Sequence, residues 1–356
     1  MVPLLMLVLL AAVPCGAQVP PEVPADAATP GSGIVPLSLV LEALQAGAGI
    51  WRPDWPAEIP PDAFAVAGAL SVELEFEAAE AELAPRPVLE RYRLARDPQG
   101  RLGELPLVLY LGDPAPGPLL AQARLHYAEG GGITAIDLEI PPLSATPLSI
   151  HFDSPYVGQD QSFPLIRVEY GETPYYVVVR AGINEIAETW FDPWGVFSAY
   201  ITSRIAPSPG SLPWRILGLE GAEYGREDSG ALIPRKLFGA SLHYESGGHM
   251  SESSGDYGSF SAIYGDRPLS WSRNSRNFSL QWDEEGRLVR LRELTTEAPE
   301  LPVDFRYDYE VDSRGNWVRR RETALLRAGN LLLPVYSRDL VRRIVYAGGE
   351  GDGGLD

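Results

Sequence analysis

Carboxylates and histidines are the side chains of this chain that could perform acid–base chemistry or bind a metal ion. A zinc site needs closely spaced ligands, and a glycosidase needs two acids that face each other across a cleft. The 356 residues include 48 Asp and Glu and four histidines: His126, His151, His243 and His249. No ligand spacing or acid pair stands out, so we assign no catalytic or metal-binding residue and expect no cofactor. The one arrangement that merits a test is His243 and His249, facing each other across the turn at Gly247 and Gly248.

Aspartates also recur in a four-residue motif that begins with Asp and ends with Gly. Asp at the first position and Gly at the fourth favour a type I turn, in which the Gly adopts the left-handed conformation and closes a hairpin. The spacing differs from that of a calcium-binding EF-hand loop, so we interpret these residues as structural turns. The four pairs are Asp97 and Gly100, Asp192 and Gly195, Asp283 and Gly286, and Asp312 and Gly315.

Alternating apolar and polar residues predict the strands that these turns connect. Residues 70–76 and 305–311 alternate in this way, as expected for half-buried strands, whereas residues 175–179 are apolar on both faces. Residues 37–46 have the helical period and are followed by Gly47 and Gly49. We therefore predict a mainly β fold. It is an antiparallel hairpin meander that forms an extended twisted sheet or a sandwich, with a short N-terminal helix. The run Arg319 to Arg321 would then protect an edge strand, and the alternative is that it contacts an acidic partner.

Tryptophans are the remaining candidates for a binding site. Trp190, Trp194 and Trp271 could form an aromatic platform for a sugar or a peptide. The alternative is core and cross-strand packing, which such rings provide in any sheet.

The N-terminus predicts export. Residues 4–13 form an uncharged apolar run that is too short to span a bilayer, and Ala17 precedes a Pro-rich stretch. Cys15, the only cysteine, leaves open the alternative of an outer-membrane lipoprotein anchored through that residue. The predicted organisation is a signal peptide (1–17), a Pro/Ala-rich tether (18–36), a short helix and loop (37–69), a β-hairpin domain (70–346) and a Gly/acid tail (347–356). Similar sequences near 123–168 and 240–284 suggest a duplicated unit within the hairpin domain.

The flanks of two turns resemble YD (RHS-like) repeats. Residues 282–288 contain an aromatic, Asp, two residues and Gly-Arg-Leu, and residues 309–317 resemble the Gly-Asn-Trp variant of exported bacterial proteins with degenerate repeats. The resemblance covers the C-terminal part only, and the chain is too short for the closed shell of the true RHS proteins. It implies an exported protein with an extended antiparallel sheet.

Charge narrows the classes of partner. The net charge of −19 argues against nucleic acid, and we expect a membrane partner only if Cys15 is lipidated. The leading hypothesis is a non-enzymatic cell-envelope protein, periplasmic or extracellular, that binds an unknown protein or glycan or has a structural role. The alternatives are a secreted glycan hydrolase that uses carboxylates and the lipoprotein anchored through Cys15.

Overall fold

A computed structural model gives the fold of this chain. It describes residues 34–46, 63–64, 66–77, 89–111, 117–140, 147–152, 156–158, 161–163, 165–206, 215–227, 229–244, 250–255, 259–264, 268–273, 276–294 and 304–346. The predicted signal peptide, most of the predicted tether and the C-terminal tail lie outside these residues.

The described residues form one helix and 22 strands. The helix, α1, spans Leu37–Ala46. The first half of the strands comprises β1 (Ala69–Phe76), β2 (Arg91–Arg96), β3 (Leu102–Leu111), β4 (Gly117–Tyr127), β5 (Ile133–Glu139), β6 (Leu148–Phe152), β7 (Tyr156–Gly158), β8 (Gln161–Phe163), β9 (Leu165–Tyr170), β10 (Thr173–Ala181) and β11 (Glu185–Phe191). The second half comprises β12 (Phe197–Ala206), β13 (Arg215–Arg226), β14 (Leu232–Tyr244), β15 (Met250–Gly255), β16 (Phe260–Tyr264), β17 (Pro268–Arg273), β18 (Arg276–Trp282), β19 (Leu288–Glu293), β20 (Asp304–Val311), β21 (Trp317–Ala328) and β22 (Leu331–Tyr346).

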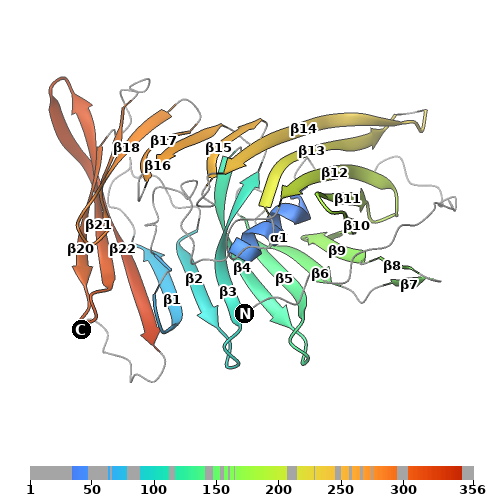
Figure 1. Cartoon of the computed structure of the whole chain (residues 1–356), viewed down its shortest axis with the longest axis horizontal. Coiled ribbons are helices and arrows are strands. Elements are labelled where there is room, and N and C mark those ends of the chain that lie inside the picture. Colours follow the sequence, from blue (N-terminus) through green and yellow to red (C-terminus); the bar gives the residue numbers. More distant parts are fainter. Residues whose placement is uncertain are drawn as a thin grey trace.

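Twenty of the strands form a closed antiparallel barrel (Figure 1). Neighbours in sequence pair with one another, β6 pairs with β9, and β22 returns to pair with β1. Strands β7 and β8 form a separate two-stranded sheet. The predicted antiparallel β fold and the helix at residues 37–46 are confirmed. The prediction of an extended sheet or a sandwich is wrong, because the pairing of β1 with β22 leaves the large sheet without an edge.

The turns between the strands explain the repeated Asp and Gly residues. In all four motifs the Gly N–H donates to the Asp carbonyl oxygen over 2.8 to 3.1 Å, and the Gly φ lies between 77° and 90°. The Asp side chain also accepts backbone N–H bonds within the turn, as Asp97 does from Gln99 and Arg101. Turns with the same backbone bonds begin at Ala128 and Glu227, where the first residue is not Asp. The motif therefore identified some, but not all, of the hairpin turns of this type.

The polarity of the barrel wall follows from the period-two alternation. On β1, Val72 and Leu74 are fully buried and point inward, while Glu73 and Glu75 point outward and pair with Arg343 of β22. The pattern repeats on β3, β5, β6 and β9, where the buried residues are Leu105, Leu107, Ile136, Leu138, Ile150 and Val168. On these strands the apolar side chains therefore form the core inside the barrel, and the charged side chains lie outside.

Candidate functional site: the barrel interior and its helix

Helix α1 lies inside the barrel, between β3–β6 and β11–β13 (Figure 1). Its sequence is apolar on more than one face, and Leu37, Leu39, Val40 and Ala43 are all at most 4% exposed. A helix that is apolar around most of its circumference is buried on several sides, rather than on the single face of a surface helix. The interior of the barrel is thus occupied by a segment of the same chain.

Glu188 on β11 caps the N-terminus of α1. The first N–H groups of a helix have no acceptor within it, and Pro36, just before α1, has no side-chain oxygen to serve as a cap. The carboxylate of Glu188 accepts the N–H of Leu37 over 2.9 Å and that of Ser38 over 2.8 Å. It also accepts the indole N–H of Trp190 over 3.1 Å. The two oxygens of this acid are therefore engaged in holding the helix against the wall.

The environment of Glu188 changes its acidity. Burial raises the pKa of this carboxyl above its ordinary value, and the hydrogen bonds from Ser38, Leu37 and Trp190 oppose that rise. The negative charge also lies at the positive end of the helix dipole, which favours it further. Desolvation is nevertheless the largest effect, because the side chain is fully enclosed.

Further polar contacts hold α1 along its length. The Ser38 hydroxyl lies 2.6 Å from that of Ser203 on β12, and the Val35 N–H donates to the Tyr170 hydroxyl over 2.9 Å. Glu42 accepts the Tyr244 hydroxyl over 3.1 Å and the Ile216 N–H over 3.3 Å. These partners come from β9, β12, β13 and β14, so several strands of one wall bind the helix.

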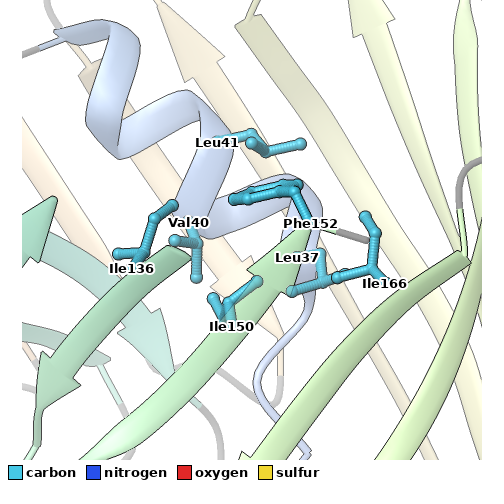
Figure 2. Close-up of a pocket in the computed structure, with 7 residues that line it drawn as sticks. All are labelled: Leu37, Val40, Leu41, Ile136, Ile150, Phe152 and Ile166. Atoms are coloured by element: carbon cyan, nitrogen blue, oxygen red, sulfur yellow. The ribbon is translucent and has the colours of Figure 1, made fainter. Parts of the chain in front are cut away.

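A small cavity lies between α1 and the opposite wall (Figure 2). Its volume is about 10 Å³, roughly the room of one water molecule and far below the ~300–1,000 Å³ of small-molecule pockets. Every side chain that lines it is apolar: Leu37, Val40, Leu41, Ile136, Ile150, Phe152 and Ile166. The cavity offers no group for acid–base chemistry.

Arginines and aromatic rings form the interior at the β20–β22 side of the barrel. Arg320, Arg338 and Arg342 are 1%, 7% and 3% exposed, and their guanidinium groups lie over the rings of Tyr307, Phe76 and Trp317 at 4.6, 5.3 and 4.5 Å. Arg338 also forms an ion pair with Glu322 at 2.8 Å. Cation–π contacts of this kind stabilise a guanidinium group that has been removed from water. Because β21 lies between β20 and β22, the predicted role of Arg319 to Arg321 at an edge strand is wrong.

A belt of cross-strand ion pairs covers the outer face from β21 and β22 round to β9. Asp339 accepts bonds from Arg319 and Arg321, and these arginines hold the pKa of its carboxyl below the ordinary value. Arg343 likewise lowers the pKa of Glu75. The belt continues through Arg93, Glu104 and Arg124, and through His151, Glu169 and Arg167. A transmembrane barrel carries an apolar band on its outer face. The outer face of these strands is charged instead.

One part of the belt has the composition of a hydrolase triad without its geometry. The Ser149 hydroxyl donates to Asp137 over 2.7 Å, and His126 lies 2.7 Å from the other oxygen of the same carboxylate. A nucleophilic serine must instead bond to the histidine, which the aspartate then orients. Asp137 therefore joins two outer-face side chains. Burial raises its pKa, but the bonds from Ser149 and His126 lower it overall.

The residues that the sequence singled out lie in different places. Trp190 is fully buried and Trp271 is 8% exposed, both inside the barrel, whereas Trp194 is 48% exposed on the turn that starts at Asp192. The structure thus does not bring the three rings together as a platform. His243 is exposed on β14, and His249 lies outside the described residues. Among the described residues, no group of His, Cys, Asp and Glu forms a potential metal site.

No sequence motif marks Glu188 or Glu42. Glu188 alternates with the apolar Ile186 and Trp190 along β11, and Glu42 lies between Leu41 and Ala43. A lone acid within an otherwise apolar inward face is the signal that could have found Glu188. None of the described residues forms a helix that is long and apolar enough to span a bilayer.

Comparison with known proteins assigns no family. No family model and no curated protein match the chain. Among solved structures, a porin-like protein from Bacteroides uniformis superposes with a TM-score of 0.31 at 10% identity, covering 78% of this chain and 98% of that protein. A porin-like protein from Bacteroides vulgatus superposes with a TM-score of 0.20, covering 79% and 98%. The TcdB2–TccC3–Cdc42 structure matches at a TM-score of 0.26 and 12% identity, covering 66% of this chain and 13% of that one. Likenesses this distant carry no conclusion about function.

Proposed function

We propose that this chain is a non-enzymatic, exported protein of the cell envelope, with a structural or partner-binding role carried by the outer surface of its barrel. The observation that carries the proposal is the polarity of the wall. Ion pairs cover the outer face from β21 round to β9, whereas the inner face packs on α1. The charged part of the wall suits contact with water, and α1 occupies the interior of the barrel.

The positions of the acids with raised pKa support a non-enzymatic role. Glu188 has both oxygens bonded to the helix and to Trp190. Burial also raises the pKa of Glu223 on β13, and the positive charge of the nearby Lys236 opposes part of that rise. A glycosidase needs its two acids on opposite sides of a substrate cleft. The cavity between α1 and the opposite wall is instead lined by apolar side chains alone.

Enzymatic assays separate this proposal from the glycan hydrolase. The purified chain is incubated with peptidoglycan and a panel of polysaccharides, and reducing ends are measured. We expect no release above the background of a matched Glu188→Gln, Glu223→Gln double variant. Release by the unaltered chain that is lost in this variant would overturn the non-enzymatic role.

Fractionation of a Gram-negative host tests the location. With a C-terminal tag, the chain is expected in the periplasmic fraction or on membranes that release it in an alkaline wash, with a mature N-terminus at Gln18 as measured by mass spectrometry. A mature N-terminus at a lipidated Cys15, with release from the membrane by Cys15→Ser, would instead establish the lipoprotein. Retention in the cytoplasm, or in the membrane after an alkaline wash in both forms, would contradict the proposal.

A further inference from the structure

The hairpin of β21 and β22 ends in a leucine-rich segment that extends past its neighbours. We call residues 325–335 the leucine tip. Strand β20 pairs with β21 only as far as Leu325, and β1 pairs with β22 only from Leu340 onward. Among the described residues, the part of the tip beyond Leu325 therefore pairs only with itself, through Leu326 with Leu333, Arg327 with Leu332, and Ala328 with Leu331. It turns back at the upper left of Figure 1.

The composition of the leucine tip differs from that of the rest of the chain. Its sequence, Leu-Leu-Arg-Ala-Gly-Asn-Leu-Leu-Leu-Pro-Val, has no acid, in a chain with 48. Leu331 is 66% exposed and Leu333 is 47% exposed. Leu332 alternates with them on the opposite face of the ribbon, next to Arg327. Clustered apolar side chains at an exposed position indicate an interaction site rather than ordinary surface variation.

Three features favour a lipid bilayer as the partner. The ribbon carries leucines on both faces, which an apolar phase can surround on every side. The tip has no carboxylate that would have to be desolvated, and an arginine can reach the phosphate level while its stem stays in the apolar phase. The ribbon between the Leu325–Pro334 pair and the Ala328–Leu331 pair is about 10 Å long at ~3.3 Å per residue. This length is comparable to the ~5–10 Å depth of interfacial insertion.

We propose that the leucine tip inserts into the interfacial layer of a lipid bilayer, with Leu331 and Leu333 in the acyl region and Arg327 at the phosphates. This inference adds a partner to the proposed envelope role. It does not require lipidation of Cys15, because the tip itself supplies the apolar surface. The net charge of −19 predicts that neutral lipid binds at least as well as anionic lipid.

Vesicle sedimentation tests the insertion. The full chain carrying Cys15→Ser, so that no acyl chain can attach, is mixed with phosphatidylcholine vesicles or with phosphatidylcholine–phosphatidylglycerol vesicles. We expect binding that added salt does not weaken, since apolar insertion is not screened. The Leu331→Asp, Leu333→Asp double variant should bind the vesicles at least about tenfold more weakly than the parent. The matched control is Leu237→Asp, at a leucine on β14 that is 72% exposed, and it should bind like the parent.

A site-specific label covers the case in which the double variant misfolds. Because Cys15 is the only cysteine, Leu331→Cys and Leu237→Cys can each be labelled with the fluorophore NBD in the Cys15→Ser background. The label at position 331 should brighten and shift to the blue with vesicles, and the label at position 237 should not. An unchanged label at position 331 overturns the proposal. So does a lipid-free dimer that the double Asp variant abolishes, since the tip would then bind a second copy. Export can hold while vesicle binding fails, so the two proposals are tested separately.

Discussion

Replacing Glu188 with alanine should release α1 from the barrel wall. The substitution removes the acceptor of three buried donors, the N–H groups of Leu37 and Ser38 and the indole N–H of Trp190. A buried donor without an acceptor costs about 1–3 kcal/mol, so the three together cost roughly 3–9 kcal/mol. The substitution also removes the desolvation penalty of a buried carboxylate, which is about several kcal/mol and offsets part of this cost. We therefore expect docking of the helix to weaken by about 2–4 kcal/mol.

Hydrogen exchange measures this loss where it occurs. A change of about 2–4 kcal/mol corresponds to roughly 30- to 1,000-fold faster exchange of the amides in residues 37–46. Amides of β21 and β22, far from the cap, should keep their protection. The matched control is Glu188→Gln, which keeps the size of the side chain and one acceptor oxygen. It should weaken docking of the helix by only about 1–2 kcal/mol.

The outcome that refutes this reasoning is specific. If the amides of α1 exchange at the parent rate in Glu188→Ala, the carboxylate is not what holds the helix. Equal loss of protection in α1 and in the β21–β22 pair would show instead that the variant unfolds globally.

Three further predictions follow from the same geometry. Burial raises the pKa of Glu188, so its favourable contribution to stability is fully present below the unfolded pKa and is lost as pH rises through the folded pKa. On acidification from pH 7, the free energy of unfolding of the parent should therefore increase relative to that of Glu188→Gln, as measured by urea titration. The pKa of Asp339 is lowered by Arg321 and Arg319, so Asp339→Asn should cost about 1–2 kcal/mol at neutral pH, with the difference shrinking as pH falls through the folded pKa. A constant difference across that range would contradict the assigned ion pairs. Gly195→Ala should lower the thermal midpoint through about 1–2 kcal/mol of left-handed strain, since its φ is 77° and no atom lies within 4 Å of the added Cβ. Gly130→Ala, also with open space but without a positive φ, is the control and should be near neutral.

The local structure of this chain could be predicted from sequence, because its causes are local. The alternation at Leu70–Phe76 places Val72 and Leu74 on one face and Glu73 and Glu75 on the other, whichever strand lies beside it. The four Asp and Gly pairs specify their turns through bonds within a few residues. The helix at residues 37–46 was also correctly bounded.

The candidate site could not be predicted, because its partners are distant in sequence. Glu188 is 150 and 151 residues from the two helix N–H groups that it accepts. Closure of the barrel depends on the pairing of β1 with β22, which joins Leu74 to Arg342. The same alternation is compatible with an open sheet, a sandwich or a barrel, since it states which side is apolar and not what covers it.

The sequence by itself therefore determined the strands at residues 70–76, 175–179 and 305–311, four of the hairpin turns, the helix and the negative net charge. Each of these depends on side chains within about one turn or one hairpin. Only the tertiary structure decided that the sheet closes, that α1 fills its interior and that the leucine tip extends past its neighbours. Closure and the docking of α1 depend on contacts across more than a hundred residues. The free energy that selects them comes from burial of surface that no local pattern specifies.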